Sequence, residues 1–370
     1  MADDWQAAWQ GTIDAVGGDF SGGVTSTAVD QIELGAVRKF LEPLELDCPL
    51  HYDPDAAKQH GYRNVLAPVA GISSTWLDAG LWRPGMGSRY PQPHPHVDIP
   101  RARTEDVPEP PVPNTTAAFA TDIEIEYFEP AVVGDRLTVR GRTLLSCVPR
   151  ETRVGRGAFM VWEREVVNQD GVRVALLRNG SYSYVPLDAP EDASSPREPE
   201  AAEEAAPEED LIAIRNVEPG DPPAVDWSNQ RYWEDVQEGD AIPPVAINLT
   251  IARLVVEAGA NRDFNQIHHN TPVSIATGAP DMYANNGFIQ AWWERAVREY
   301  IGLGGRFKKT GPFRMRIFNT VGESAVTSGT VKRKWVEDGE HLVEIEVQTE
   351  ISRGTSVGPG PVVVSLPTRS

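Results

Sequence analysis

The sequence predicts an α+β fold built from two similar halves, each a central helix wrapped by an antiparallel β-sheet. Three observations lead to this prediction: landmark residues recur in the same order in both halves, a long amphipathic helix pattern lies in the second half, and alternating strand-like segments occur in both. The 370 residues are 40% hydrophobic and contain no run of about eighteen apolar residues, so we expect a large buried core and no membrane-spanning segment.

The spacing of a few residues indicates the repeat. His51 is followed ten residues later by Gly61, and His268 is followed ten residues later by Gly278. Further along the chain, the segment GDRLTVRG at 134–141 has the same length as GESAVTSG at 322–329. Two matches in the same order favour a duplicated domain. We therefore expect a first repeat over residues 1–187 and a second over residues 227–370.

Two segments interrupt this plan. Residues 188–226 are acidic, rich in Pro, Ala and Glu and poor in aromatics, which is typical of a solvated linker; an acidic interaction tail is the alternative. In the first repeat, residues 81–114 form an insertion whose prolines exclude a long helix or a central strand. His94 and His96 lie in it without companion ligands, so we expect a surface loop and no metal site.

The second half carries the clearest helix pattern. From Asn286 to Tyr300, apolar residues recur with helical spacing and include the adjacent Trp292 and Trp293, while polar residues fill the other face and glycines follow the end. Period-two alternation follows in HLVEIEVQTEI, and a similar pair of strand-like segments flanks the turn NQDG at 168–171 in the first half. The sequence therefore predicts a buried helix followed by antiparallel strands.

Composition excludes several classes of function. The formal net charge of −20 argues against nucleic-acid binding, which depends on clustered Lys and Arg. The two cysteines, Cys48 and Cys147, are too few for a disulfide framework and lack metal or redox spacing, so we expect small buried hydrophobes. The chain begins without a basic region followed by an apolar stretch, which predicts a cytoplasmic protein without an export signal.

The residues that carry chemistry lie just before the predicted helix. The segment EAGANRDFNQIHHN at 257–270 brings a carboxylate, an amide and an imidazole together at Asp263, Asn265 and His268. It resembles the signature of the MaoC-like (R)-specific enoyl-CoA hydratases: Asp, then Asn two residues later, then Pro, an aliphatic residue and His. The present chain has Gln266 in place of the Pro. YWEDVQEGDAIPP at 232–244 also looks like the opening of that family's domain.

This resemblance implies a double hotdog fold and a reaction. The family adds water reversibly to a 2-enoyl-CoA to give a 3-hydroxyacyl-CoA, a reaction that needs an oriented water, a base and a proton donor. In the family His acts as base while Asp orients the water and shuttles a proton, which implies syn addition and an (R) product. Asp263 and His268 are the expected catalytic pair, and Asn265 is expected to support the loop or the water. No cofactor is expected, since CoA is part of the substrate.

Negative charge on the thioester oxygen needs backbone donors, and a helix N-terminus offers them. We expect the amides of Asn286 and Gly287 to take this role, although the family usually has His-Gly there. Seven basic residues lie near the second half's strands. Solvated strand faces explain most of them, and one or two are expected to bind CoA phosphates; the seven are Arg306, Lys308, Lys309, Arg314, Lys332, Arg333 and Lys334.

The first half is predicted to be catalytically degenerate. Aligning His51 on His268 puts Leu46 at the position of Asp263 and Cys48 at that of Asn265. Residues 40–71 resemble the family's degenerate N-terminal dehydratase domain. One active site per chain follows, and we expect the first half to supply space for the acyl chain.

The helix segment MYANNGFIQAWWERAVREYIG at 282–302 resembles hydratases that act on steroid side-chain enoyl-CoA thioesters, so a bulky polycyclic or branched acyl-CoA is the expected substrate. Two other functions stay open: a non-catalytic acyl-thioester binding protein, and a hotdog thioesterase using Glu294 on the central helix. We expect the two repeats to form a pseudo-dimer within the chain, and a further homodimer is compatible with this fold.

Overall fold

The computed structural model describes residues 5–78, 80–94, 96, 99, 107–187 and 218–369. Residues 188–217, most of the expected linker, lie outside the described residues. The described parts of the insertion at 81–114 form no helix or strand, in agreement with its prolines.

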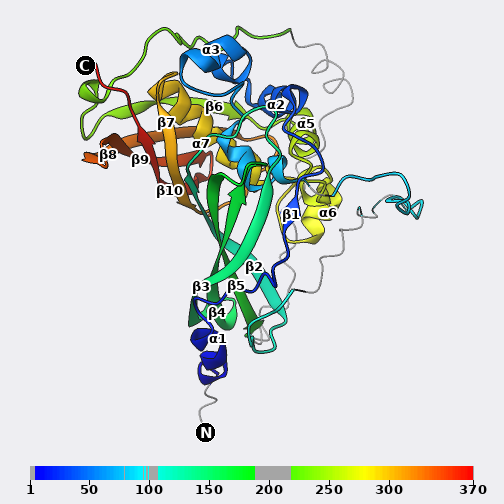
Figure 1. Cartoon of the computed structure of the whole chain (residues 1–370). Coiled ribbons are helices and arrows are strands. Elements are labelled where there is room, and N and C mark those ends of the chain that lie inside the picture. The colour runs from blue at the N-terminus through cyan, green and yellow to red at the C-terminus, as the bar shows by residue number, and fades with distance from the viewer. Residues whose placement is uncertain are drawn as a thin grey trace.

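The first half begins with short helices and ends with long strands (Figure 1). Its elements are η1 (Ala7–Trp9), α1 (Gln10–Asp14), β1 (Ser26–Thr27), α2 (Leu34–Leu41), η2 (Glu42–Leu44), η3 (Pro49–His51), α3 (Pro54–Gln59), η4 (Val69–Ser73), η5 (Thr75–Leu77), β2 (Ala117–Tyr127), β3 (Thr138–Thr152), β4 (Gly155–Val167) and β5 (Arg173–Pro186).

The second half has the same general order, with one long helix before its last four strands. Its elements are η7 (Trp233–Asp235), β6 (Ala241–Asn248), α5 (Ile251–Asn261), η8 (Gln266–His268), α6 (Thr271–Ala276), α7 (Asn286–Ile301), β7 (Arg306–Phe313), β8 (Ser324–Glu337), β9 (Glu340–Ile351) and β10 (Gly354–Ser365).

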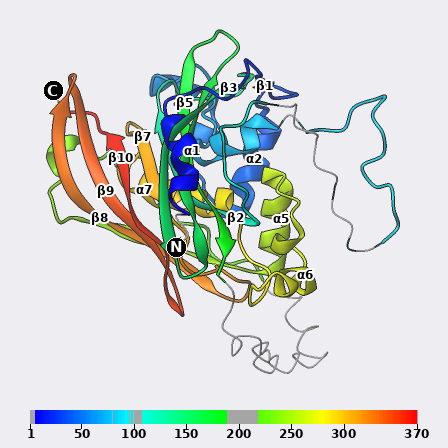
Figure 2. The same cartoon turned by 90° about the horizontal axis from the view of Figure 1, so that it is seen from below.

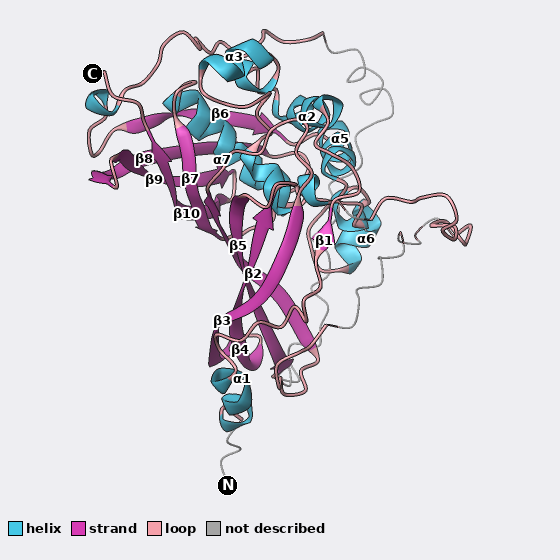
Figure 3. Cartoon of the chain, in the orientation of Figure 1, coloured by secondary structure: helices cyan, strands magenta, loops and turns pink. Residues whose placement is uncertain are grey.

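All ten of these strands form one antiparallel sheet in the order β1-β3-β4-β5-β2-β7-β10-β9-β8-β6. The halves join where β2 pairs with β7, with Ile125 opposite Thr310 and Glu126 opposite Lys309. Figure 3 shows α2, α3, α5 and α7 gathered on one side of the strands, and Figure 2 shows the strands of the second half curving around α7. This layered arrangement is the α+β architecture that the sequence predicts.

The same contact between a histidine side chain and a backbone carbonyl occurs in both halves. Nδ1 of His51 lies 2.8 Å from the carbonyl oxygen of Leu66, and Nδ1 of His268 lies 2.8 Å from the carbonyl oxygen of Tyr283, each fifteen residues further along the chain. In both halves a short helix, α3 or α6, begins three residues after the histidine. The same turn is therefore built twice.

Helix α7 is buried on every side. Trp292 and Trp293 are fully buried in the core, as the apolar pattern predicts. The expected polar face is also covered: Glu294, Arg295 and Arg298 are 3%, 7% and 1% exposed. The first half covers that face, since Nη1 of Arg295 donates to the carbonyl of Leu44 and the Glu294 carboxylate accepts from first-half amides. A helix that is covered all round needs such partners for its polar groups.

The first half departs from the expected plan in one respect: where α7 stands in the second half, it has only the short 3₁₀ turns η4 and η5. Trp76 packs closely against this segment, since a Cβ on Gly71 would lie 2.4 Å from the Trp76 ring. Trp76 folds back over this glycine, and its Nε1 donates to the carbonyl of Pro68 at 2.8 Å. The Ser and Thr residues that follow favour helices weakly. The long central helix therefore belongs to the second half alone.

One hydrophobic core runs through both halves, from Ile32 to Leu366, and a smaller cluster beneath α1 contains Trp9, Leu144 and Met160. Cys48 and Cys147 are free and buried, as the sequence predicts. Among the helices of the described residues, none is both long enough and apolar enough to span a bilayer.

Candidate active site

The catalytic pair predicted from the sequence lies together in the structure. Asp263 and His268 occupy the turn between α5 and α6, and Oδ2 of Asp263 is 3.5 Å from Nε2 of His268. The Asp263 side chain is 43% exposed, whereas that of His268 is 8% exposed. The turn starts at Arg262, whose φ of 60° reverses the chain after α5. One face of the pair is thus open to a small molecule such as water.

The hydrogen bond to Tyr283 fixes the chemical state of His268. Because a carbonyl oxygen only accepts, Nδ1 carries a proton, and in the neutral ring Nε2 then presents its lone pair towards Asp263. Burial lowers the pKa of His268, and this effect exceeds the opposing influence of Asp263 and of the Tyr283 carbonyl. A neutral imidazole with a free Nε2 is suited to accept a proton.

Asn265 supports the turn and lies away from the cavity. It is exposed, and its side chain accepts from the amide of Ile267 at 3.3 Å, which caps η8. Gln266, which stands where the resembling family has proline, is buried, and its Nε2 donates to the carbonyl of His96 at 2.9 Å. The insertion in the first half therefore contacts the catalytic turn of the second.

The N-terminus of α7 faces the same cavity. Asn286 and Gly287 are its first two residues, and within the described part of the chain no acceptor engages their amides. Asn285 caps the helix, with its Oδ1 accepting from the amide of Phe288 at 2.9 Å. The two remaining N–H groups are available to a ligand oxygen, where the helix dipole favours negative charge.

An asparagine that sequence reasoning missed connects the turn to the helix. Asn261 Nδ2 donates to Asn285 Oδ1 and to Glu257 Oε2, both at 2.9 Å. Its Oδ1 accepts from Asn285 Nδ2 and from the amide of Asp263, both at 3.1 Å. Burial and nearby Asp263 raise the pKa of Glu257 well above its usual value. In the sequence, the signal for this contact is the spacing of Glu257 and Asn261, which lie four residues apart on a predicted helix.

Both halves wall the cavity, whose volume is about 450 Å³. The second half contributes the residues already described, and the first half contributes Ser73, Ser74, Asp78, Ile123 and Asn179.

An ion pair between Arg262 and Asp78 stands at one side of this cavity. The same two residues also line a neighbouring cavity of about 360 Å³ between α2, η5 and α5, whose walls include Ile32, Ala36 and Trp76. The ion pair therefore separates two spaces that lie side by side.

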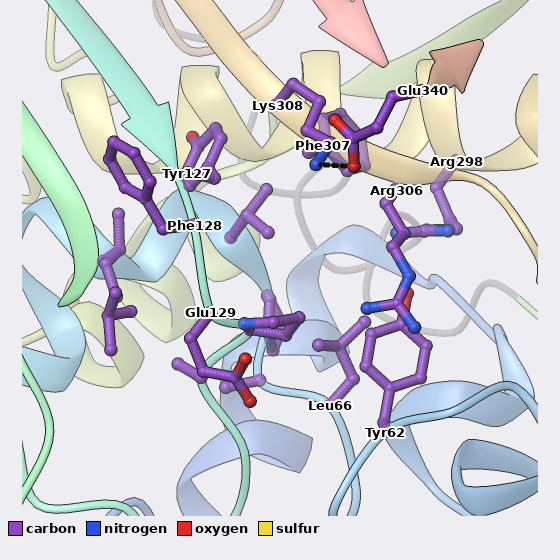
Figure 4. Close-up of a pocket in the computed structure, with 17 residues that line it drawn as sticks. Tyr62, Leu66, Tyr127, Phe128, Glu129, Arg298, Arg306, Phe307, Lys308 and Glu340 are labelled. Atoms are coloured by element: carbon purple, nitrogen blue, oxygen red, sulfur yellow. Dashed lines mark hydrogen bonds and ion pairs between the residues drawn. The ribbon is translucent and has the colours of Figure 1, made fainter. Parts of the chain in front are cut away.

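The equivalent position in the first half differs from that of His268. His51 is fully buried, its Nε2 has no partner among the described residues, and burial lowers its pKa to about 3. The amides of Val69 and Ala70, which match Asn286 and Gly287, donate to the Glu294 carboxylate at 2.8 Å each. A third cavity, of about 190 Å³, lies beside this segment (Figure 4).

Most of the seven basic residues near the second half's strands are engaged on the sheet. Five of the seven pair with carboxylates on the sheet, whereas Arg306 and Lys334 contact backbone carbonyls. None of the seven lines the cavity that holds Asp263 and His268, whose lining includes Arg262. Among the described residues, no group of His, Cys, Asp or Glu is arranged to hold a metal ion.

Comparisons with known proteins agree with this arrangement. Residues 19–177, most of the first half, match a family model described as the FAS1-like, dehydratase domain region. No curated protein matches the sequence of the chain.

Three solved structures match over nearly the whole chain. A MaoC-like dehydratase is 18% identical, covers 94% of this chain and 98% of its own, and has a TM-score of 0.62. A MaoC-like dehydratase from Phytophthora capsici is 14% identical, with coverages of 96% and 99% and a TM-score of 0.57. A Mycobacterium tuberculosis protein described as a double hotdog is 11% identical, with coverages of 95% and 96% and a TM-score of 0.52. The chain is therefore a double hotdog, as the resemblance implied.

Proposed function

We propose that this chain is an enoyl-CoA hydratase, which adds water reversibly to a 2-enoyl-CoA and forms a 3-hydroxyacyl-CoA. One observation carries the proposal: the Asp263–His268 pair, 3.5 Å apart, lines the same cavity as the unengaged amides of Asn286 and Gly287. An acid–base pair beside an oxyanion site is what the reaction requires. The dehydratase names of the matching family model and structures support it.

The proposed reaction uses these groups in order. A water held between Asp263 and His268 attacks the β-carbon, and one of its protons passes to Nε2 of His268. The amides of Asn286 and Gly287 hold the negative charge on the thioester oxygen. The α-carbon then takes a proton from the Asp263–His268 pair, so the product has gained one water. The (R) configuration rests on the resemblance to the MaoC-like hydratases.

The position of Glu294 argues against the thioesterase alternative. Its carboxylate is buried and accepts two hydrogen bonds from Val69 and Ala70, and it does not line the cavity that holds Asp263. A thioesterase needs a carboxylate or a water at the thioester carbonyl. Of the two carboxylates that line this cavity, Asp78 pairs with Arg262, whereas Asp263 faces His268.

We further propose that the acyl group is bulky and that the first half gives it space. Ser73, Ser74 and Ile123 form part of the catalytic cavity, and the cavity beyond the Arg262–Asp78 pair is lined by Ile32 and other apolar residues. The charged residues that line this second space, Asp30, Glu33 and Asp78 against Lys39 and Arg262, leave one negative charge in excess, which disfavours the phosphates of CoA. Polycyclic or branched acyl-CoA thioesters are the expected substrates.

The test is a hydration assay on short, long and steroid-like 2-enoyl-CoA thioesters, with free thiol monitored in parallel. Asp263→Asn and His268→Ala should each lower turnover by at least about 100-fold, while His341→Ala, a histidine on β9 outside the cavity, should not. Thiol release would indicate a thioesterase. Binding without turnover would indicate a non-catalytic binding protein, and a preference for crotonyl-CoA would overturn the bulky-substrate proposal.

A further inference from the structure

The small cavity of the first half occupies the place that corresponds to the catalytic cavity. Leu66, Pro68 and Val69 line it, and they match Tyr283, Asn285 and Asn286 of the second half in the repeat. Its remaining walls come from the end of β2, the start of β7 and Arg298 of α7 (Figure 4). The duplication has thus left two cavities, one with catalytic groups and one without.

The small cavity of the first half lacks the groups that are proposed to carry out the reaction in the catalytic cavity. Glu294 already occupies the amides of Val69 and Ala70, so these amides are closed to a thioester oxygen. No carboxylate stands where Asp263 stands, since Leu46 holds that position and is buried. The shape of this cavity and the charged side chains that line it are suited to binding a ligand.

Its charges favour an anion. Arg298 is 1% exposed and donates from Nη1 to the carbonyls of Gly302 and Gly305, while its Nε has no partner among the described residues. Arg306 reaches only the carbonyls of His60 and Gly61, at 3.3 and 3.5 Å. Within the described part of the chain, neither guanidinium pairs with a carboxylate. Two such cations are unusual in a chain whose formal net charge is −20.

The other charged groups at the cavity limit that anion to a single charge. Lys308 pairs with Glu340 at 2.5 Å, and Glu129 pairs with Arg63 at 3.0 Å. Figure 4 shows the Arg306 guanidinium above the Tyr62 ring, with the Glu129 carboxylate across the cavity. The lining therefore has three cations and two carboxylates, a balance that matches a monoanion.

The rest of the lining is apolar and the volume is small. Phe128, Phe307, Val174 and Ile72 form part of the apolar wall. The volume of about 190 Å³ is below the roughly 300–1,000 Å³ typical of sites for drug-sized ligands. A ligand must therefore be short, with an apolar body for the walls and its charge at Arg306.

We propose that this cavity is a second ligand site, separate from the catalytic one, that binds a small monocarboxylate with an apolar body. The planar guanidinium of Arg306 matches the two oxygens of a carboxylate, and the hydrocarbon part lies against the aromatic and aliphatic walls. The proposal does not depend on hydratase activity, because it rests on groups outside the catalytic cavity.

Calorimetric titration of the full-length protein with hexanoate and with hexanamide tests it. Hexanoate should bind with millimolar affinity or better, and the neutral amide at least about tenfold more weakly. Arg306→Met should weaken hexanoate binding by at least about tenfold, because a hydrogen bond to a charged group is lost. Arg306→Gln, which keeps donors for the His60 and Gly61 carbonyls, should weaken it similarly.

Two control variants locate the binding. Arg333→Met removes a surface arginine that pairs with Glu344, and His268→Ala changes the catalytic cavity; both should bind hexanoate as the wild type does. Thermal unfolding shows whether each variant is folded. No heat of binding, equal binding of acid and amide, or loss of binding in His268→Ala with retention in Arg306→Met would overturn the proposal.

Discussion

His268 illustrates how burial and one hydrogen bond set the state of a single residue. Its Nδ1 is held by the Tyr283 carbonyl, and its pKa is lowered chiefly because burial disfavours the charged ring. The half-exposed Asp263 beside it raises the pKa of His268, but by less than burial lowers it. A histidine in this setting stays neutral, and therefore able to take a proton, in more acidic solution than an ordinary histidine.

This state predicts the pH dependence of the reaction. Because the base must be neutral, kcat/KM should rise with pH through the pKa of His268 and level off above it. Since that pKa is lowered, the acid limb should lie below the ordinary histidine value of about 6.5. Hydration rates measured from about pH 4.5 to 8 give the limb directly. An acid limb above neutrality would show that another group, or a different state of His268, governs the rate.

Asn261 is the second residue on which the site depends. It joins the amide of Asp263 to the helix cap Asn285, so it holds the acid–base pair and the helix amides in one geometry. Asn261→Ala should lower kcat by at least about tenfold with little change in KM, and should reduce the free energy of unfolding by about 1–3 kcal/mol through unpaired buried groups. Asn248→Ala, at an exposed asparagine of β6, is the control. Reduced stability with unchanged kcat would make the role of Asn261 purely structural.

At the scale of elements, α7 serves both halves. Its first amides face the catalytic cavity, and one side chain two turns later, Glu294, holds η4 by two hydrogen bonds. Burial raises the pKa of Glu294 to about 7, although the Ala70 and Val69 amides oppose this shift. The helix thus contacts the first half where that half has only short 3₁₀ turns.

The Glu294 contact predicts how stability depends on pH. The folded protein binds a proton at Glu294 more tightly than the unfolded chain does, so this carboxyl contributes stability below its unfolded pKa. That contribution, on the order of 3 kcal/mol, is lost as the pH rises to about 7. Urea unfolding from about pH 5 to about pH 8 should show a less negative slope with pH in Glu294→Gln than in the wild type. Glu340→Gln, at an exposed carboxylate, should leave the slope unchanged; equal slopes in all three proteins would contradict the account.

Elements that depend on local pattern could be predicted from the sequence, and those that depend on contacts between the halves could not. The span of α7 and the hairpin after Asn168 followed from periodicity and turn residues, and Asp263 and His268 from their motif. The packing of Trp76 over Gly71 in the first half and the burial of Arg298 in α7 are tertiary contacts. The spacing of residues along the sequence does not indicate such contacts.

At the scale of the whole molecule, the two repeats share one sheet and one main hydrophobic core. Pairing of β2 with β7 makes the sheet continuous, and the catalytic cavity is closed by residues of both halves. The Arg262–Asp78 pair, with one residue from each half, stands between this cavity and the next. Under the proposed function, both halves together set the size of the acyl group that fits.

Filling the second cavity should change substrate choice without harming the fold. Gly259 of α5 lines that cavity, and a Cβ on it would meet nothing within 4 Å. Replacing a glycine inside a helix favours the helix by up to about 1 kcal/mol. Gly259→Leu should lower kcat/KM for bulky enoyl-CoA thioesters by at least about tenfold and leave crotonyl-CoA unaffected. Val255→Leu, on an exposed part of α5, is the control; an equal loss for all substrates would contradict the proposed acyl space.

The most direct test of the central proposal is the product formed from a 2-enoyl-CoA by the wild type and by His268→Ala. The account predicts a 3-hydroxyacyl-CoA without free thiol from the wild type, and a loss of at least about 100-fold in the variant. Free CoA thiol as the main product, or hydration that persists in His268→Ala, would contradict it.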